Sequence, residues 1–415
     1  MESVAFVPSI TWVVPFVILL LGIAVFPLAF PRFWESNLRK LLVSIALGAP
    51  VLALYAQHHP ASIGHTATDY VSFMVLLGSL YVISGGVLMD GDLEATPLVN
   101  TMFLASGALL ASLVGTTGAS MLLIRPLLHT NAERRHVVHT VVFFIFVVSN
   151  VGGCLTPLGD PPLFLGYLLG VPFTWTLRLF PAWLATIAMI LVVYYVWDAR
   201  AYAAESPASR RADHTMIEPL TVKGRENLAL LFGIVLATAL LDAPFRELAM
   251  IALAGLSLAR TPRELRAANH FSFHPILEVA VVFAGIFLTM MPALDLLRAR
   301  GGELGVREPW HFFWATGFLS SFLDNAPTYL TFVALGQGQR LAAEVVGLPH
   351  DILQAISLGA VFMGANTYIG NGPNFMVRSI AESRGIQMPS FGGYMLYSGA
   401  VLIPVFVIVT VMFFR

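Results

Sequence analysis

The sequence predicts an all-α polytopic membrane protein built from two inverted repeats, each of five transmembrane helices, one of them broken, plus a re-entrant hairpin. Three observations predict this fold. The 415 residues are 57% hydrophobic and only 11% charged, whereas a soluble protein carries about 25% charged residues. Apolar runs near the length that spans a bilayer, about 20 residues, recur along the chain. Two of these runs are interrupted by glycine and proline, at 149–162 and 364–374, about half a chain apart.

Composition also excludes several classes of function. The net charge is −1 and no basic patch is present, so a nucleic-acid partner is not expected. The single cysteine, Cys154, excludes an internal disulfide and has no second thiol or histidine beside it for a metal. Neither HExxH, a P-loop nor a GxSxG elbow occurs in a fitting context. We therefore expect no enzyme and no cofactor, with Na⁺ or H⁺ as a coupling ion.

The first predicted repeat covers residues 1–197. Its opening apolar run has no Lys or Arg before it, so a retained first helix is favoured over a signal peptide. The run at 100–129 is polar in its middle and is predicted to form a re-entrant hairpin rather than a span. In order, the predicted elements are spans near 11–30, 39–56 and 67–88, the hairpin, a broken helix at 137–150 and 161–171, and a span near 174–197.

A hydrophilic linker at 198–224 separates this repeat from the second, which covers 225–415. The second repeat is predicted to have the same order. Its elements are spans near 226–241, 245–260 and 274–297, a hairpin at 309–346 broken at 323–328, a broken helix at 351–365 and 373–384, and a span near 392–414.

Five crossings are an odd number, so the two repeats are expected to face opposite ways across the membrane. An offset of 209 residues supports the repeat by aligning Asp69 with Glu278, Ser112 with Ser321, and Thr116 with Asn325. Most of the 23 Lys and Arg residues fall on one side if the N-terminus is outside. We therefore predict a multi-pass protein of the inner cell membrane, with both termini outside and the linker in the cytoplasm.

The interruptions predict the functional site. Unwound backbone survives in hydrocarbon only where protein buries it or where it lines a cavity, and transporters hold ions and substrates at such breaks. New helices are expected after Asp160, Asn325 and Gly372, each of which shortly precedes a proline. Helix starts suit anions, whereas the carbonyls near Ser149-Asn150 and Ala365-Asn366 suit Na⁺.

Specific roles follow from residue type and position. Asp160 either only caps the following helix or binds Na⁺ together with Asn150 and Asn366. Asp324 lies before the expected cap residue Asn325, at an apolar hairpin tip; as an acid inside the membrane it is expected to carry the coupled proton, with Glu278 as second choice. Glu278 is alternatively a surface charge, or marks one vestibule while Asp69 marks the other. The remaining candidate ion or substrate ligands are Ser149, Gly153, Thr156, Asn325, Thr328, Thr367, Asn371 and Asn374.

At these residues the sequence resembles the ion transporter superfamily, which includes NhaD-type sodium/proton antiporters, arsenite-efflux proteins, and citrate and dicarboxylate transporters. The segment SNVGGCLTPLGDPP at 149–162 is similar to an antiporter-type motif, and LDNAPT at 323–328 resembles an acidic hairpin tip. The segments at 275–294 and 364–377 resemble a bacterial branch associated with citrate transport or sodium/proton antiport. The resemblance covers nearly the whole chain. It implies paired re-entrant hairpins, a homodimer in the lipid bilayer and an elevator-type movement.

The chain departs from the dicarboxylate branch, which carries Ser-Asn-Thr at both sites. Here the first is Ser149-Asn150-Val151, and the second hairpin begins with Asp324-Asn325. Extra acids would repel a carboxylate substrate, so exchange of Na⁺, or a similar monovalent cation, for H⁺ is favoured. The alternative is Na⁺- or H⁺-coupled transport of citrate or another di- or tricarboxylate, with anions at the helix starts of Pro161, Pro327 and Pro373. A third hypothesis, an intramembrane aspartyl protease, lacks the expected YD and GxGD contexts.

Overall fold

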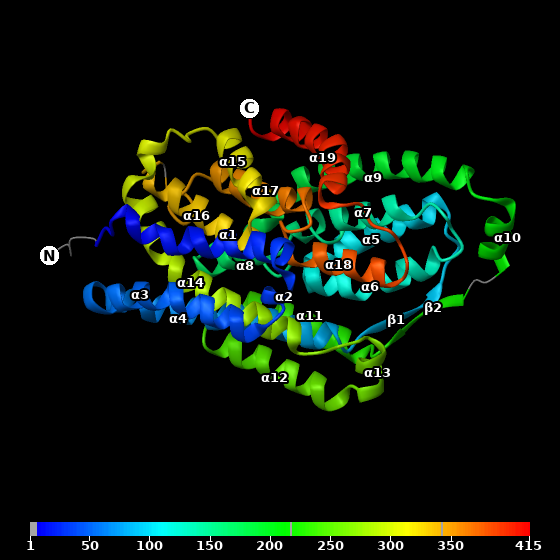
Figure 1. Ribbon diagram of the computed structural model, residues 1–415, viewed down its shortest axis with the longest axis horizontal. Coiled ribbons are helices and arrows are strands. Elements are labelled where there is room, and N and C mark those ends of the chain that lie inside the picture. The colour runs from blue at the N-terminus through cyan, green and yellow to red at the C-terminus, as the bar shows by residue number, and fades with distance from the viewer. Residues whose placement is uncertain (1–5, 216–217, 342) are drawn as a thin grey trace.

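The computed structural model describes residues 6–215, 218–341 and 343–415, and nearly all of their regular structure is helical (Figure 1). Seven of the described helical segments are long and apolar enough to cross a membrane. Many large apolar side chains on the outer helices are exposed, among them Ile18, Leu42, Val192 and Leu396. Such extensive exposed apolar surface is typical of a face that contacts lipid. The predicted all-α polytopic membrane fold is confirmed.

The first half of the chain follows the predicted order. Its helices are α1 (Val14–Ala29), the single turn α2 (Pro31–Trp34), α3 (Asn37–His58) and α4 (Pro60–Ser84), then the hairpin of α5 (Pro97–Val114) and α6 (Thr116–Thr130), the broken helix of α7 (Val138–Val147) and α8 (Pro161–Leu168), and α9 (Phe180–Ala203). The hairpin turns at Gly115, whose φ of 84° lies in the region that favours glycine.

The second half repeats this order of elements. Its helices are α11 (Glu226–Leu240), α12 (Phe245–Arg260), the short α13 (Arg263–Ala268) and α14 (His274–Arg300), then the hairpin of α15 (Pro309–Phe322) and α16 (Asn325–Gly338), the broken helix of α17 (His350–Met363) and α18 (Gly372–Ser383), and α19 (Phe391–Phe413). In Figure 1 the α5–α6 hairpin lies toward the right end of the molecule and the α15–α16 hairpin toward the left end. The opposite orientation of the two halves in a membrane stays a prediction.

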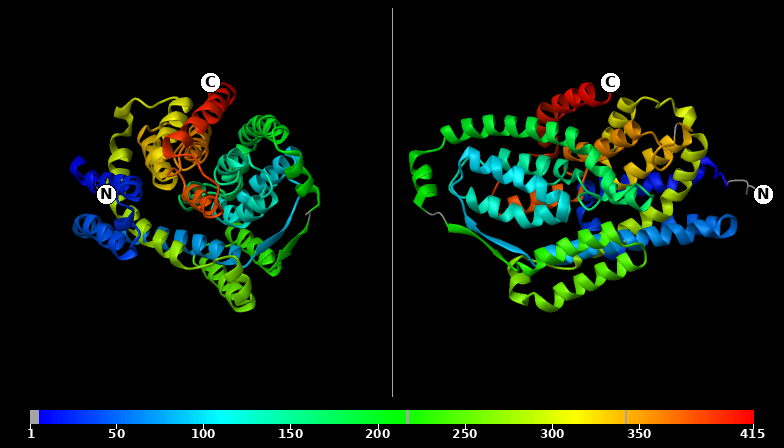
Figure 2. Two further views of the ribbon diagram at one scale, coloured as in Figure 1. Left: turned by 45° about the vertical axis from the view of Figure 1, so that its right-hand side comes forward. Right: turned by 180° about the vertical axis from the view of Figure 1, so that it is seen from behind.

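Helices at equivalent positions in the two halves make equivalent contacts with the opposite half. Helix α3 packs against α14, and its counterpart α12 packs against α4. Likewise α8 contacts α16, and its counterpart α18 contacts α6. Aromatic packing stabilises the interface between the two halves. The rings of Phe73 on α4 and Phe283 on α14 stack at a centroid distance of 4.8 Å. In Figures 1 and 2, α3, α4 and α12 run along one side of the molecule, and the hairpins and broken helices lie over them.

The predicted linker 198–224 contains regular structure. Helix α9 continues to Ala203, and Asp198, which marks the end of the apolar run, is buried in an ion pair with Arg134 at 2.5 Å and lies 2.8 Å from His139 Nε2. The linker then forms α10 (Pro207–Thr215) and strand β2 (Glu218–Lys223), which pairs antiparallel with β1 (Leu88–Asp92). Residues 216–217 of the linker lie outside the described residues.

Candidate functional site

Asp160 immediately precedes α8 and is almost completely buried, with 1% of its surface exposed. An aspartate in this position usually accepts a hydrogen bond from an N–H of its own first turn, but the Asp160 side chain makes none. Its Oδ1 accepts from Thr116 Oγ1 at 2.8 Å and from Asn371 Nδ2 at 3.1 Å, and its Oδ2 accepts from Asn325 Nδ2 at 2.5 Å. Asp160 therefore joins the first break to both hairpins and to the second break.

The two breaks share one construction. Ser112 on α5 donates to a backbone carbonyl of the first break at 2.5 Å, and Ser321 on α15 donates at 3.0 Å to the carbonyl of Met363, directly before the second break. In return, Thr156 Oγ1 donates to the Ser112 carbonyl and Thr367 Oγ1 to the Ser321 carbonyl. Peptide groups that lose their helical partners inside a membrane must be satisfied by neighbouring protein. These reciprocal bonds satisfy several of them in both breaks.

Glycines allow the backbone of each break to cross itself closely. A Cβ placed on Gly159 would lie 2.2 Å from the carbonyl oxygen of Gly153. In the second break, a Cβ on Gly370 would lie 2.5 Å from the carbonyl oxygen of Gly364. Both distances are shorter than any real Cβ contact, so any side chain here would force the backbone apart. Gly153 thus supports the break through its backbone rather than offering a side-chain ligand.

Three buried amide oxygens near the breaks have no hydrogen-bond donor in the described part of the chain: Oδ1 of Asn150, of Asn325 and of Asn366. Their amide nitrogens are already committed. Asn150 Nδ2 donates to a backbone carbonyl at 2.8 Å, Asn325 Nδ2 to Asp160, and Asn366 Nδ2 to Ser321 Oγ at 2.9 Å. A buried acceptor without a partner costs about 1–3 kcal/mol. A cation that takes oxygen ligands would relieve this cost.

Asparagines of the second break also bridge to the first. Asn371 Nδ2 donates to the Ser149 carbonyl at 3.1 Å as well as to Asp160. Asn374 Oδ1 accepts from Asn150 Nδ2 at 2.7 Å, while its own nitrogen donates to the Thr367 carbonyl at 2.9 Å. The two breaks, far apart in sequence, therefore form one hydrogen-bonded unit.

The ionisable groups of this unit are two carboxyl groups, those of Asp160 and Asp324. The hydrogen-bond partners of Asp160 found among the described residues are Thr116, Asn325 and Asn371, all neutral. Asp324, at the tip of the second hairpin, lies near enough to Asp160 for their carboxyl groups to interact electrostatically. Two carboxyl groups without a bonded cation attract positive ions in a low-dielectric site. The geometry is therefore suited to a small cation.

Residues 6–414 match the model of the family described as "Putative citrate transport". The chain belongs to this family. Two relatives, an uncharacterized transporter of Mycobacterium bovis and one of Mycobacterium tuberculosis, are each 26% identical to the chain over 399 residues, which is 88% of this chain and 91% of each relative. The protein is a membrane transporter of the citrate transport family, whereas the narrower antiporter branch stays a prediction.

In this member of the citrate transport family, the predicted helix caps need two corrections. Asp324, not Asn325, is the cap of α16: Asp324 Oδ1 accepts from the Ala326 N–H at 3.0 Å, and the helix begins at Asn325. Asn325 is the first helical residue, and its Nδ2 donates to Asp160. At α18 the flanking residue is Asn371, and Gly372 is already helical. Proline at the second helical position leaves no donor unsatisfied there.

The other predicted ligands have local roles in the structure. Thr328 Oγ1 donates to the Asp324 carbonyl at 2.9 Å, one turn back in the helix. Ser149 Oγ lies 2.7 Å from Ser120 Oγ. Within the described residues no group of three or more His, Cys, Asp or Glu could hold a metal ion, so the predicted Na⁺ ligand set of Asp160, Asn150 and Asn366 depends on amide oxygens.

Glu278, the second predicted proton carrier, is not joined to this unit by any hydrogen bond or ion pair among the described residues. It lies in the first turns of α14 and forms an ion pair with Lys40 of α3 at 2.6 Å. Its side chain is 40% exposed, whereas Lys40 is 2% exposed. This ion pair links α3 to α14 and includes no residue of the two breaks.

The prediction did not assign Thr116 to the ion or substrate ligands, although Thr116 contacts Asp160 directly. The signal for it lay in the internal repeat. The offset of 209 residues pairs Thr116 with Asn325, and both donate to the Asp160 carboxylate. The same offset pairs Ser112 with Ser321, the two serines that support the breaks.

Proposed function

We propose that the protein is a secondary transporter that exchanges Na⁺, or a similar monovalent cation, for H⁺. One observation carries the proposal: the buried Asp160 carboxylate accepts hydrogen bonds from three neutral side chains, beside three amide oxygens to which no described residue donates. A carboxylate with neutral partners keeps its charge available for a ligand. Amide oxygens that receive no hydrogen bond from the described residues have lone pairs free to coordinate a cation.

Exchange follows from competition for the same carboxyl groups. A carboxylate cannot favour a proton and a metal ion at once, so the binding of one expels the other. Asp324 supports this scheme because its carboxyl group interacts electrostatically with that of Asp160. Two acids coupled in this way bind protons and cations as a pair. In this proposal Asp160 binds the cation, and Asp324 exchanges the proton.

Coupled transport of citrate, or of another di- or tricarboxylate, is the second candidate. The family description favours it, as do the starts of three helices, α8, α16 and α18, at the breaks. Two of these starts are already flanked by acids, Asp160 and Asp324, and only α18 is preceded by a neutral residue, Asn371. An anion would meet like charge at two of the three positions, which makes a cation the better ligand.

Proteoliposomes that contain the purified protein and a trapped pH dye separate the two functions. We expect a pulse of NaCl to dissipate a preset proton gradient, and a choline chloride pulse to leave it intact. Labelled citrate should not accumulate under a Na⁺ or H⁺ gradient. Gradient-dependent citrate uptake without Na⁺-driven proton movement would overturn the proposal. Asp324→Asn sharpens the distinction, because it should abolish proton-coupled exchange while citrate uptake would tolerate it.

The proposal includes a place in the inner membrane as a homodimer, with both termini outside and the linker in the cytoplasm. Exposed apolar faces on α1, α3, α9 and α19 provide the surface that lipid or a second copy would cover. Single cysteines introduced at Ser9 and at Ser206 would test the orientation. We expect an impermeant thiol reagent to label the first and not the second in intact cells.

A further inference from the structure

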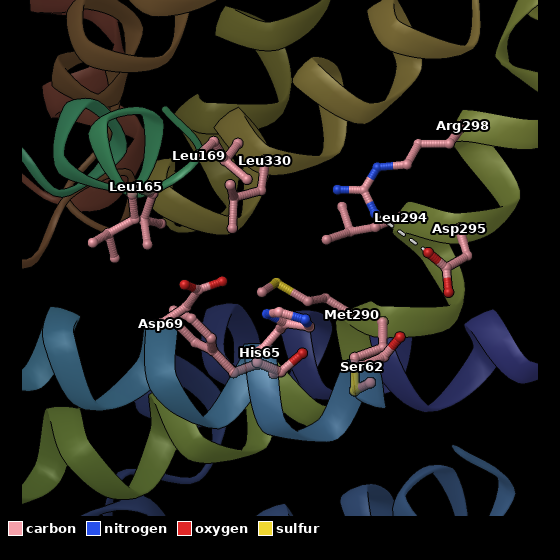
Figure 3. A pocket seen from close by; sticks show the side chains of 14 residues that line it. Ser62, His65, Asp69, Leu165, Leu169, Met290, Leu294, Asp295, Arg298 and Leu330 are labelled. Carbon is pink, nitrogen blue, oxygen red and sulfur yellow. Dashed lines mark hydrogen bonds and ion pairs between the residues drawn. The ribbon is translucent and has the colours of Figure 1, made fainter. Parts of the chain in front are cut away.

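A second polar site lies outside the breaks, in a cavity of about 260 Å³. Helices α4 and α14 form one wall of this cavity, and α8 and α16 form the other (Figure 3). We call it the α4–α8 cavity. Its charged residues come from the first wall only: Asp69 from α4, and Asp295 and Arg298 from α14, with His65 of α4 beside them.

Asp69 is the acid in this cavity whose charge is unmatched. It lies well inside α4, a helix long and apolar enough to span the membrane, and its side chain is half-buried. Figure 3 shows the carboxylate directed into the open space between the walls. No hydrogen bond or ion pair of Asp69 is found in the part of the chain that the structure describes; His65 is its electrostatic neighbour. An ionisable group inside a membrane that lacks a partner is a candidate functional group.

Asp295 differs from Asp69 because it is fully engaged. Its Oδ2 accepts from Tyr55 Oη at 2.7 Å, and its Oδ1 pairs with Arg298 at 3.3 Å. The charges of Asp295 and Arg298 therefore offset each other. Among the described residues that line the cavity, Asp69 is therefore the carboxylate that no arginine offsets.

The opposite wall connects the cavity to the breaks. It consists of leucines, with Leu165 on α8, Leu169 directly after α8, and Leu330 on α16. Helix α8 starts directly after Asp160, so Leu165 lies about 7.5 Å further along the helix axis. Leu165 and Leu330 are 3% and 6% exposed. The cavity wall opposite Asp69 is thus formed partly by leucines of the helix that starts directly after Asp160.

We infer that Asp69 binds the transported monovalent cation in the α4–α8 cavity, as a first site on the path to Asp160, and that the leucines of α8 and α16 close this path in the present conformation. The inference rests on the proposed cation exchange and adds to it a second, separate site. The ligand class follows from the charge: a single unmatched carboxylate in a half-buried cavity attracts a small cation and repels an anion.

Thiol labelling tests the site without requiring transport. Thr66 lines the cavity, and the native Cys154 is completely buried, so Thr66→Cys supplies the reactive thiol. We expect NaCl to slow the reaction of this thiol with an impermeant cationic methanethiosulfonate several-fold, compared with choline chloride at equal ionic strength. Adding Asp69→Asn should remove the protection. Adding Glu264→Gln, at an exposed acid outside the cavity, is the control and should keep it. Ser62→Cys replaces Thr66→Cys if that variant does not fold.

The outcomes separate this inference from the proposed function. If the wild-type protein exchanges Na⁺ for H⁺ but labelling is equal in NaCl and choline chloride, or the protection survives Asp69→Asn, the Asp69 site is wrong and the exchanger stands. If Na⁺ protects the thiol through Asp69 but no exchange occurs, the cation site stands and the exchanger is wrong.

Discussion

Asn371 donates a hydrogen bond from its Nδ2 to Oδ1 of Asp160 at 3.1 Å, and the two residues occupy matching places in the two breaks. Each directly precedes a second half-helix, α8 or α18, and neither side chain caps its own helix. The repeat therefore brings a carboxylate and its amide counterpart face to face. The first break supplies the carboxyl group of Asp160, and the second break supplies the Asn371 amide that holds this group in its orientation.

Replacing that charge tests the site most directly. In Asp160→Asn the side chain keeps its size, but one end would present an NH₂ group to the donors Thr116 and Asn371 or to Asn325. We expect Na⁺-driven proton movement to fall at least tenfold, on the order of 1.4 kcal/mol, toward the level of empty vesicles. Glu264→Gln, at an exposed acid on α13, is the control and should transport normally. Near-normal exchange by Asp160→Asn would show that the cation binds elsewhere.

Thr116→Val removes one of the three donors to Asp160 and nearly preserves side-chain volume. A hydrogen bond to a charged group contributes about 1.5–3 kcal/mol, so the apparent affinity for Na⁺ should weaken about tenfold or more. Thr117→Val is the matched control because Thr117 is the next residue and is exposed. Both variants are compared by titrating NaCl in the dye assay. Equal affinities for the two variants would contradict a role of Thr116 in the site.

The positions of the spans and of the breaks could be predicted from the sequence because they depend on local chemistry. Apolar run length fixes a span, and the glycines and prolines at 149–162 and 364–374 stop the helices wherever they occur. The predicted break at 161 coincides with the start of α8 at Pro161.

The parts that could not be predicted depend on distant partners. Helix α9 passes residue 197 because Arg134 neutralises Asp198, a contact across many residues. Likewise, whether Asn325 caps its own helix or turns to Asp160 is decided by the first break, not by its neighbours in sequence. Glu278 and Asp69 match in sequence, yet Lys40 engages only Glu278. The internal repeat predicts equivalent positions but not the different partners that each position meets.

The C-terminal end of α9 predicts a pH dependence of stability. Burial alone would raise the pKa of Glu205, but hydrogen bonds from the backbone N–H groups of His136 and Arg135 and from the His136 ring outweigh it and hold the pKa below its usual range. A lowered pKa stabilises the fold above the ordinary glutamate value, about 4.3, and this contribution is lost as the pH falls below it.

Thermal unfolding in detergent measures this contribution. The Tm difference between wild type and Glu205→Gln should be constant above about pH 6 and shrink below about pH 4.3. Glu303→Gln, at an exposed glutamate, should show no such trend. A difference that grows on acidification would have the wrong sign for a lowered pKa and would contradict this assignment.

The close backbone crossing in the first break predicts a strict requirement for glycine. In Gly159→Ala the new Cβ would lie 2.2 Å from the Gly153 carbonyl oxygen, and backbone cannot move aside as a flexible side chain can. Overpacking of a buried site costs about 1–3 kcal/mol or more, so the Tm should fall by several degrees and Na⁺ exchange should be lost. Gly372→Ala is the matched control, since nothing lies within 4 Å of a Cβ there; alanine also favours the helix that begins at this residue. If Gly159→Ala unfolded at the same temperature as Gly372→Ala, the backbone of the first break would have to run differently from the crossing described.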